Sequence, residues 1–177
     1  MKTAVFLDRD GVLNPPDERD GRTRAPVTLE AFRLYPWAAE AVCRLRDAGL
    51  LCFVVTNQPE VATGELARDV LDAMHLRLKR ETGVDAIYVC PHVDADGCDC
   101  RKPRPGLLRR AAEEWGVDLG ASFLVGDRWR DIEAGVTAGC TTVLVEGSSG
   151  AGGRAHFRAA TLVDAVTVIL EARKGRR

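Results

Sequence analysis

Residues 4–14 read Ala-Val-Phe-Leu-Asp-Arg-Asp-Gly-Val-Leu-Asn, and more follows from this stretch than from any other in the chain. The apolar run 4–7 ends abruptly at Asp8, and Asp10 and Gly11 come directly after it. Carboxylates at the end of a buried strand must be paired or bound to a cation, and open parallel α/β sheets bind ligands at the carboxyl ends of their strands. The stretch therefore predicts an active-site strand, with Mg²⁺ as the natural counter-ion. A strand followed by a solvated Asp-Gly turn is the structural alternative.

The chain has 177 residues and a formal net charge of -1 at pH 7. Its length predicts a single domain, residues 1–177. The balanced charge argues against a nucleic-acid-binding protein, which would carry a strongly basic face. No signal-peptide pattern opens the chain, and no run approaches the roughly 18 apolar residues of a membrane span. We therefore expect a cytoplasmic protein that binds neither nucleic acid nor membrane, with a monomer as the default oligomeric state.

Apolar, β-rich runs alternate with segments of helical periodicity along the chain. The predicted strands are 4–7, 50–55, 86–89, 122–125 and 141–145, and the predicted helices cover about 36–50, 65–82, 105–115, 130–138 and 163–173. Two segments, 15–28 and 147–153, are rich in Pro, Gly, Ser or charge and are predicted to be loops. The alternation predicts an α/β fold with a Rossmann-like, doubly wound parallel sheet in three αβα layers. No insertion of domain size interrupts the pattern, so we expect no large cap domain.

Polar side chains follow the ends of the predicted strands. The second strand leads to Thr56, Asn57 and Gln58, the loop after the third leads to Arg101 and Lys102, and the fourth leads to Asp127 and Asp131. If the strands are parallel neighbours, these groups and the first two aspartates share one crevice. Carboxylates that hold a hard cation, together with Lys and Arg, suit a phosphoryl group. No Gly-x-x-x-x-Gly-Lys loop is present, so a P-loop nucleotide site is not indicated.

Taken in order, these motifs resemble those of the haloacid dehalogenase phosphatase superfamily: Asp8-Arg9-Asp10-Gly11, Thr56, Lys102 and Gly126-Asp127-x-x-x-Asp131. The resemblance covers about residues 3–170. It implies that Asp8 attacks phosphorus and forms an aspartyl-phosphate, and that Asp10 is the general acid and base. Thr56 and the following Asn57 and Gln58 would bind the substrate phosphate, and Lys102 would stabilise the developing charge.

The same resemblance implies a Mg²⁺ site formed by Asp8, the Asp10 backbone carbonyl and Asp127. For Asp131 two interpretations stay open. It could orient Lys102 or a metal-bound water, or it could be an exposed acid in the first turn of a helix, where the helix dipole favours it.

Three of the six cysteines lie close to a histidine in the segment 90–103. Cys90, His92, Cys98 and Cys100 offer three thiolates and one imidazole, a set that suits structural Zn²⁺. The zinc would hold the loop that carries Arg101 and Lys102 in place. Three reduced cysteines without a metal are the alternative. The other three, Cys43, Cys52 and Cys140, stand singly among apolar residues and are expected in the core.

This zinc loop resembles the branch of the superfamily that contains the heptose bisphosphate phosphatases and the histidinol phosphatases. The resemblance implies a phosphatase of a small sugar bisphosphate, most simply a heptose 1,7-bisphosphate that loses its 7-phosphate. Arg101, Arg128 and Arg19 of the Arg-rich segment 15–26 would bind the rest of the substrate. Two departures leave histidinol phosphate or an octose bisphosphate open: five residues separate His92 from Cys98, and Thr63 stands where heptose enzymes carry an arginine. An inactive phosphate-binding module is the non-enzymatic alternative.

Overall fold

The computed structural model describes residues 1–19, 21–146 and 154–175. Six parallel strands form its main sheet, in the order β5-β4-β1-β6-β7-β8. Their bounds are Ala4–Leu7 for β1, Leu51–Asn57 for β4, Ala86–Cys90 for β5, Phe123–Gly126 for β6, Thr141–Val145 for β7 and Phe157–Ala159 for β8. The first five agree with the predicted strands to within about a residue or two, whereas β8 was not predicted because it is only three residues long.

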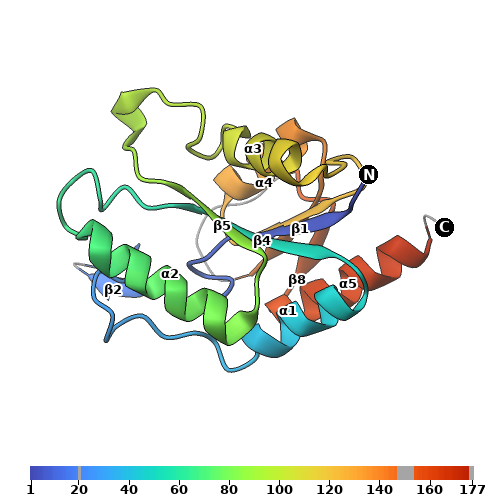
Figure 1. Cartoon of the computed structure of the whole chain (residues 1–177), viewed down its shortest axis with the longest axis horizontal. Coiled ribbons are helices and arrows are strands. Elements are labelled where there is room, and N and C mark those ends of the chain that lie inside the picture. The colour runs from blue at the N-terminus through green and yellow to red at the C-terminus, as the bar shows by residue number, and fades with distance from the viewer. Residues whose placement is uncertain (20, 147–153, 176–177) are drawn as a thin grey trace.

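Helices cover both faces of this sheet (Figure 1). On one face lie α1 (Ala38–Asp47), α2 (Arg68–Thr82) and α5 (Leu162–Lys174), and on the other lie α3 (Gly106–Trp115) and α4 (Trp129–Ala138). The result is the three-layer αβα fold that the alternation of strands and helices predicts. Among the described residues no domain-sized insertion interrupts it, and no helix is long and apolar enough to cross a membrane.

The four residues of β1 show why the sheet holds together. Val5 and Leu7 pack with α1, α2 and α5, while Ala4 and Phe6 pack with α3 and α4. All four are fully buried. Because a parallel sheet is covered on both faces, its central strand is apolar along its whole length rather than alternating.

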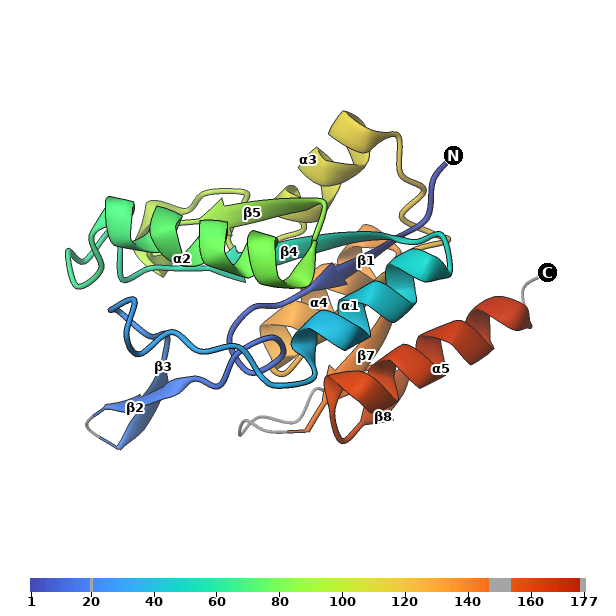
Figure 2. The same ribbon diagram turned by 60° about the horizontal axis from the view of Figure 1, so that its bottom comes forward.

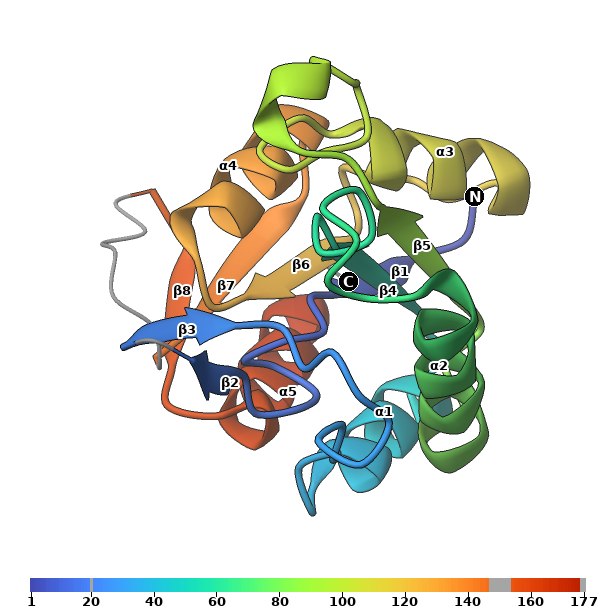
Figure 3. The same ribbon diagram turned by 90° about the vertical axis from the view of Figure 1, so that its left-hand side faces the viewer.

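The strand order reverses at β1, which has β4 on one side and β6 on the other. Ligands bind at such a switch point, at the carboxyl ends of the strands. Figure 3 shows this end of the molecule, with the chain after β4, the zinc loop after β5 and a β-hairpin arranged around it. The site is therefore built from loops that the sheet holds in fixed relative positions.

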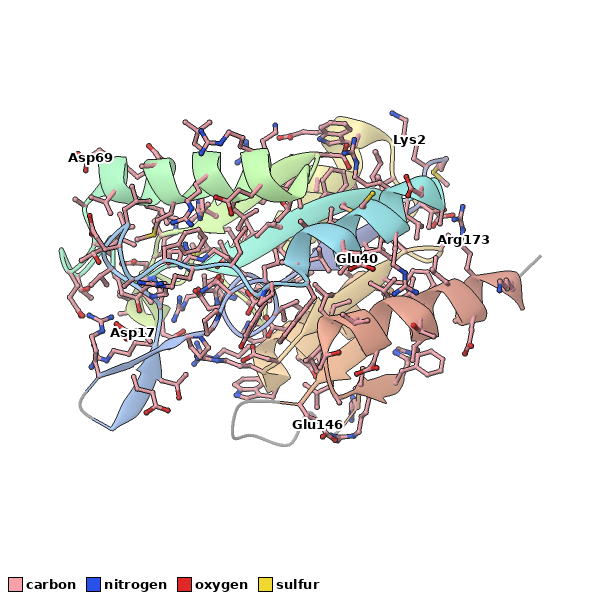
Figure 4. The ribbon with its side chains drawn as sticks, turned by 90° about the horizontal axis from the view of Figure 1, so that it is seen from below. Lys2, Asp17, Glu40, Asp69, Glu146 and Arg173 are labelled. Carbon is pink, nitrogen blue, oxygen red and sulfur yellow. The ribbon has the colours of Figure 1, made fainter. Side chains whose placement is uncertain are left out.

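That hairpin corrects the prediction of a loop for residues 15–28. β2 (Asp17–Arg19) and β3 (Arg22–Arg24) pair antiparallel, with Asp17 opposite Arg24. Opposite charges facing each other across two strands stabilise such a pair, but three-residue polar strands carry no hydrophobic period that could predict them. The hairpin projects from the sheet beneath α2 (Figure 2). Its Asp17 lies at the same end of the molecule as Asp69 of α2, away from Lys2 and Arg173 (Figure 4).

Cys52 and Cys140 are buried as expected, but Cys43 is exposed, because it lies on the outer face of α1. Its apolar neighbours in the sequence point the other way, toward the core. The predicted loop at 147–153 lies outside the described residues.

Candidate active site

The side chain of Lys102 joins three segments at the centre of the site. Its Nζ lies 2.7 Å from an Asp8 carboxylate oxygen and 2.6 Å from an Asp131 carboxylate oxygen, and it donates to the Val55 carbonyl at 2.8 Å. All three charged side chains are buried. Asp131 is therefore not the exposed helix acid of the structural alternative. It contacts Lys102, and it also accepts a hydrogen bond from the Arg128 backbone N–H at 3.0 Å, closing the first turn of α4.

The electrostatics of this group follow from burial and crowding. Burial, followed by the Asp131 carboxylate, raises the pKa of Asp8 to about 8, against the opposing effect of Lys102. Burial would lower the pKa of Lys102, but the carboxylates of Asp131 and Asp8 outweigh it and raise that pKa. Three carboxylates face one ammonium here when Asp127 is counted, so the site attracts further positive charge.

One carboxylate oxygen from each of Asp8, Asp127 and Asp131 lies within 4.8 Å of the other two. The backbone leaves room for this grouping. A Cβ on Gly11 would lie 2.2 Å from Asp127 Oδ2, and Gly11 has a φ of +92°, which L side chains rarely adopt. A buried set of carboxylates around a glycine turn fits a hard, oxygen-binding cation such as Mg²⁺.

The Asp10 carboxylate lies in a cage of hydrogen-bond donors. Arg9 Nε and Nη2 lie 3.0–3.2 Å from its two carboxylate oxygens, Asn14 Nδ2 donates at 2.9 Å and Gln58 Nε2 donates at 2.7 Å. Burial would raise the pKa of Asp10, but Arg9 and these hydrogen bonds lower it. Donors from three side chains thus hold the Asp10 carboxyl in one orientation.

Residues at the carboxyl end of β4 form hydrogen bonds within the site and to the Lys102 backbone. Gln58 Nε2 also donates to the Thr56 hydroxyl at 2.9 Å. The Asn57 side chain forms two hydrogen bonds with the Lys102 backbone, one to its carbonyl and one from its N–H, both at 3.1 Å. Asn57 therefore fixes the end of the zinc loop against β4.

A cavity of about 660 Å³ opens above Asp8, Asp10 and Lys102. It is lined by four arginines, Arg24, Arg101, Arg128 and Arg130, together with Asp94, Asn57, Glu60 and Trp129. Asp94 joins two of the arginines: Arg101 Nε lies 2.7 Å from its carboxylate and Arg130 Nη1 lies 3.1 Å from it. The four guanidiniums on the lining suit an anionic ligand.

The four zinc-loop side chains come together although they span eleven residues. The distances are 3.6 Å from Cys90 to Cys98, 3.4 Å from Cys98 to Cys100, 3.3 Å from Cys100 to His92 Nδ1 and 3.7 Å from Cys90 to His92 Nδ1. A tetrahedral Zn²⁺ with ligands at about 2.0–2.3 Å places them roughly 3.3–3.8 Å apart. The set fits such an ion.

Comparisons with known proteins bear on this geometry. Residues 99–168 match a family model described as HAD-hydrolase-like. The chain is 42% identical over 154 residues to the D-glycero-beta-D-manno-heptose-1,7-bisphosphate 7-phosphatase of Pseudomonas aeruginosa, with 84% of each chain covered. The corresponding protein of Bordetella bronchiseptica is 38% identical, with 82% of each chain covered. The chain belongs to the haloacid dehalogenase-like phosphatases, in their heptose bisphosphate phosphatase branch.

A solved structure agrees with this assignment. The structure of the D,D-heptose 1.7-bisphosphate phosphatase of B. bronchiseptica, complexed with magnesium and phosphate, superposes on the present structure with a TM-score of 0.79 at 33% identity. The superposition covers 97% of this chain and 99% of the B. bronchiseptica chain. The predicted fold class and superfamily are confirmed, and the phosphatase is a phosphomonoester hydrolase.

Most of the site residues expected from the sequence of the phosphatase meet at the carboxyl end of the sheet. Asp8, Asp10, Asn57, Arg101, Lys102 and Arg128 line the cavity, and Asp127 lies beside Asp8. Thr56 and Gln58 are not among the lining residues: both are buried, and Gln58 donates to Asp10 and to the Thr56 hydroxyl directly behind the cavity. Arg19 lies outside the lining and contacts the Ala25 carbonyl, Asp17 and Glu65. Arg24, on the facing strand, lines the cavity instead.

Sequence reasoning missed the partners of these residues. Arg9 enters the sequence prediction only as part of the motif Asp8-Arg9-Asp10-Gly11, yet among the described residues it is the largest fully buried side chain. His75 and Asp94, which contact Arg9 and Arg101, had no motif to mark them. The one signal in the sequence was the position of Arg9, which lies between two aspartates directly after the apolar run 4–7.

Proposed function

We propose that this phosphatase removes the 7-phosphate of D-glycero-D-manno-heptose 1,7-bisphosphate through an aspartyl-phosphate on Asp8, with Mg²⁺ as its metal. The similarity to the named enzymes over more than four fifths of both chains carries this proposal. The magnesium and phosphate in the B. bronchiseptica structure support the metal and the bound group.

In the first step an Asp8 carboxylate oxygen attacks phosphorus, and the bond from phosphorus to the sugar oxygen breaks. Asp10 gives a proton to that leaving oxygen. Lys102 and Thr56 donate to the phosphoryl oxygens, where negative charge gathers. The contact between Lys102 and Asp131 supports this role, because it holds the ammonium beside the reacting oxygen.

In the second step water attacks the phosphorus of the aspartyl-phosphate while Asp10 takes its proton, and Asp8 is released as a carboxylate with inorganic phosphate. Asp8, Asp127 and the Asp10 backbone carbonyl would hold Mg²⁺, with Asp131 beside them. When bound, the ion offsets the repulsion between anionic nucleophile and anionic phosphate.

The second phosphate of the substrate would bind at the mouth of the cavity. Arg101 and Arg128 were predicted to contact the substrate, and both line the cavity. Arg24 and Arg130 also line the cavity and are further candidates, whereas Arg19 lies outside the lining. A doubly anionic sugar matches this cationic rim better than the amino alcohol of histidinol phosphate does.

Zinc would bind Cys90, His92, Cys98 and Cys100 as a structural ion. Its role would be to hold the backbone from which Arg101 and Lys102 project. Arg101 Nη1 donates to the His92 carbonyl at 3.0 Å, which supports a direct connection between the two sites. That the enzyme is a cytoplasmic monomer stays a prediction.

Phosphate release tests the substrate. The purified chain with Mg²⁺ is assayed on heptose 1,7-bisphosphate, an octose bisphosphate and histidinol phosphate, and ³¹P NMR identifies the phosphate that remains on the sugar. We expect the highest kcat/KM on the heptose, with the 1-phosphate retained. Equal or faster turnover of histidinol phosphate would contradict the substrate. No turnover of any phosphomonoester would favour the inactive binding module.

A further inference from the structure

A buried arginine separates the proposed general acid from the helix behind it. Arg9 is fully buried and uses Nε and Nη2 on the two oxygens of Asp10. Nη2 also donates to Gln58 Oε1 at 2.9 Å. A guanidinium has five N–H donors in one rigid plane, so these contacts fix the orientation of that plane. Nη1, at the edge of the guanidinium away from Asp10, then needs a separate hydrogen-bond acceptor.

His75 of α2 lies at that far side. Its Nε2 is 3.2 Å from Arg9 Nη1, across 66 residues of sequence. Arginine can only donate, so Nε2 accepts and the ring proton is on Nδ1. Burial, together with the neighbouring guanidinium of Arg9, lowers the pKa of His75 to about 4, which is consistent with a neutral ring. The ring of Phe32 lies 5.3 Å from the guanidinium carbon and covers one face of it.

The geometry has a consequence for Asp10. The acid must aim one oxygen at the leaving group, and small errors in orientation are costly in a proton transfer. Asn14 and Gln58 also donate to this carboxylate, but only Arg9 spans both of its oxygens, and only His75 accepts from the outer nitrogen of Arg9 in the described part of the chain. The orientation of Asp10 therefore depends on a side chain of α2 that does not line the cavity.

We propose that His75 is a positioning residue for phosphoryl transfer, acting through Arg9 to orient the Asp10 carboxyl toward the leaving oxygen. This inference rests on the proposed function, in which Asp10 protonates the sugar oxygen. It predicts that His75 matters only when the leaving group needs a proton. A sugar alkoxide needs one, whereas p-nitrophenolate leaves readily without it.

The test compares kcat/KM on heptose 1,7-bisphosphate with kcat/KM on p-nitrophenyl phosphate, since this parameter reports the transfer to Asp8 whatever the rate of the later hydrolysis. For His75→Leu we expect a loss of about 10- to 100-fold on the sugar phosphate and less than about threefold on p-nitrophenyl phosphate. His75→Gln should restore the sugar activity, because its amide oxygen can accept from Nη1 near the position of Nε2.

Two further variants keep the test decisive. Met74→Ala removes a fully buried side chain from the same helix and should lower stability without changing the ratio of the two activities. If His75→Leu does not fold, His75→Asn replaces it: the shorter amide is neutral and polar but does not reach Nη1, so the ratio should still fall.

The outcomes separate the two proposals. Equal losses on both substrates, an unchanged ratio in His75→Leu or His75→Asn, or the same ratio change in Met74→Ala would overturn the positioning role and leave the phosphatase intact. If the wild type hydrolyses another alkyl phosphate but not heptose 1,7-bisphosphate, that alkyl phosphate replaces the heptose in the comparison with p-nitrophenyl phosphate. A wild type inactive on every phosphomonoester would overturn both.

Discussion

The ammonium of Lys102 lies 2.7 Å from a carboxylate oxygen of Asp8, although 94 residues separate the two along the chain. One comes from the zinc loop and the other from the end of the central strand. The contact exists because β1, β4 and β5 are parallel neighbours whose carboxyl ends meet.

Asp8→Asn should abolish turnover while the chain stays folded, because an amide cannot act as the nucleophile. We expect kcat to fall by at least about 10³-fold on any phosphomonoester. Steady-state phosphate release measures it, and circular dichroism checks the fold. Asp69→Asn, an exposed change on α2, is the matched control. Turnover within tenfold of wild type would refute Asp8 as the nucleophile.

Asp131→Asn should lower kcat with little change in KM. It leaves Lys102 with one carboxylate partner instead of two, so the ammonium loses its fixed position near the phosphoryl oxygens. The expected loss is about 10- to 100-fold. Glu133→Gln, on the same helix, should be neutral. A KM effect without a kcat effect would indicate that Asp131 acts in substrate binding.

Asp94→Asn should weaken binding of the bisphosphate selectively. The Asp94 carboxylate holds Arg101 and Arg130 side by side, and without it the two guanidiniums are no longer paired at the rim. We expect KM for heptose 1,7-bisphosphate to rise about three- to tenfold, with a smaller change for heptose 7-phosphate, which lacks the second anion. Asp99→Asn, exposed on the same loop, is the control. Equal changes for both sugars would contradict the rim as the second phosphate site.

Cys98→Ser should reduce bound zinc and thermal stability more than it changes the chemistry. The proposed ion closes the loop 90–103, and a serine hydroxyl is a poor substitute for a thiolate ligand. Metal analysis and thermal unfolding measure the two effects, and Cys43→Ser, whose thiol is exposed outside the cluster, should change neither. One zinc per chain retained in Cys98→Ser would show that the ligand assignment is wrong.

His75 should make stability depend on pH. Its pKa of about 4 in the folded chain lies below the ordinary 6.5, so between these values the unfolded chain binds the proton and the folded chain does not. The free energy of unfolding then falls as the pH drops through this window. His75→Gln has no such group, so between pH 7 and 4.5 the wild type should lose about 2–3 kcal/mol more than the variant. Urea unfolding at both pH values measures the difference. Parallel losses would place the His75 pKa near its ordinary value.

Asp8 and Arg9 are neighbours in the chain, but only one of the two could be predicted as a site residue. Asp8 could be predicted, because a carboxylate that ends an apolar run has few structural explanations. Arg9 could not, since an arginine beside two aspartates is compatible with a solvated turn. Its burial depends on α2, whose position over the sheet no local pattern describes.

The arginines of residues 15–26 show the same limit. A loop was expected to bring Arg19 to the substrate, but in the hairpin Arg24 lines the cavity and Arg19 does not. Asp17 lies opposite Arg24, and residues two apart on a strand share a face, so Arg19 and Arg24 lie on the same face of the hairpin and both contact Glu65. Only the packing of the hairpin against the rest of the chain decides which of the two arginines lines the cavity.

The sequence alone determined the succession of strands and helices and the chemistry at the strand ends. Hydrophobic periodicity is local, and parallel strands must present their carboxyl ends together. The side chains that hold those groups in place could be found only from the packing of the folded chain: His75 behind Arg9, Asp131 beside Lys102, and Asp94 between two arginines. Such contacts join segments tens of residues apart, and they depend on how helices and loops pack on the sheet rather than on any spacing along the chain.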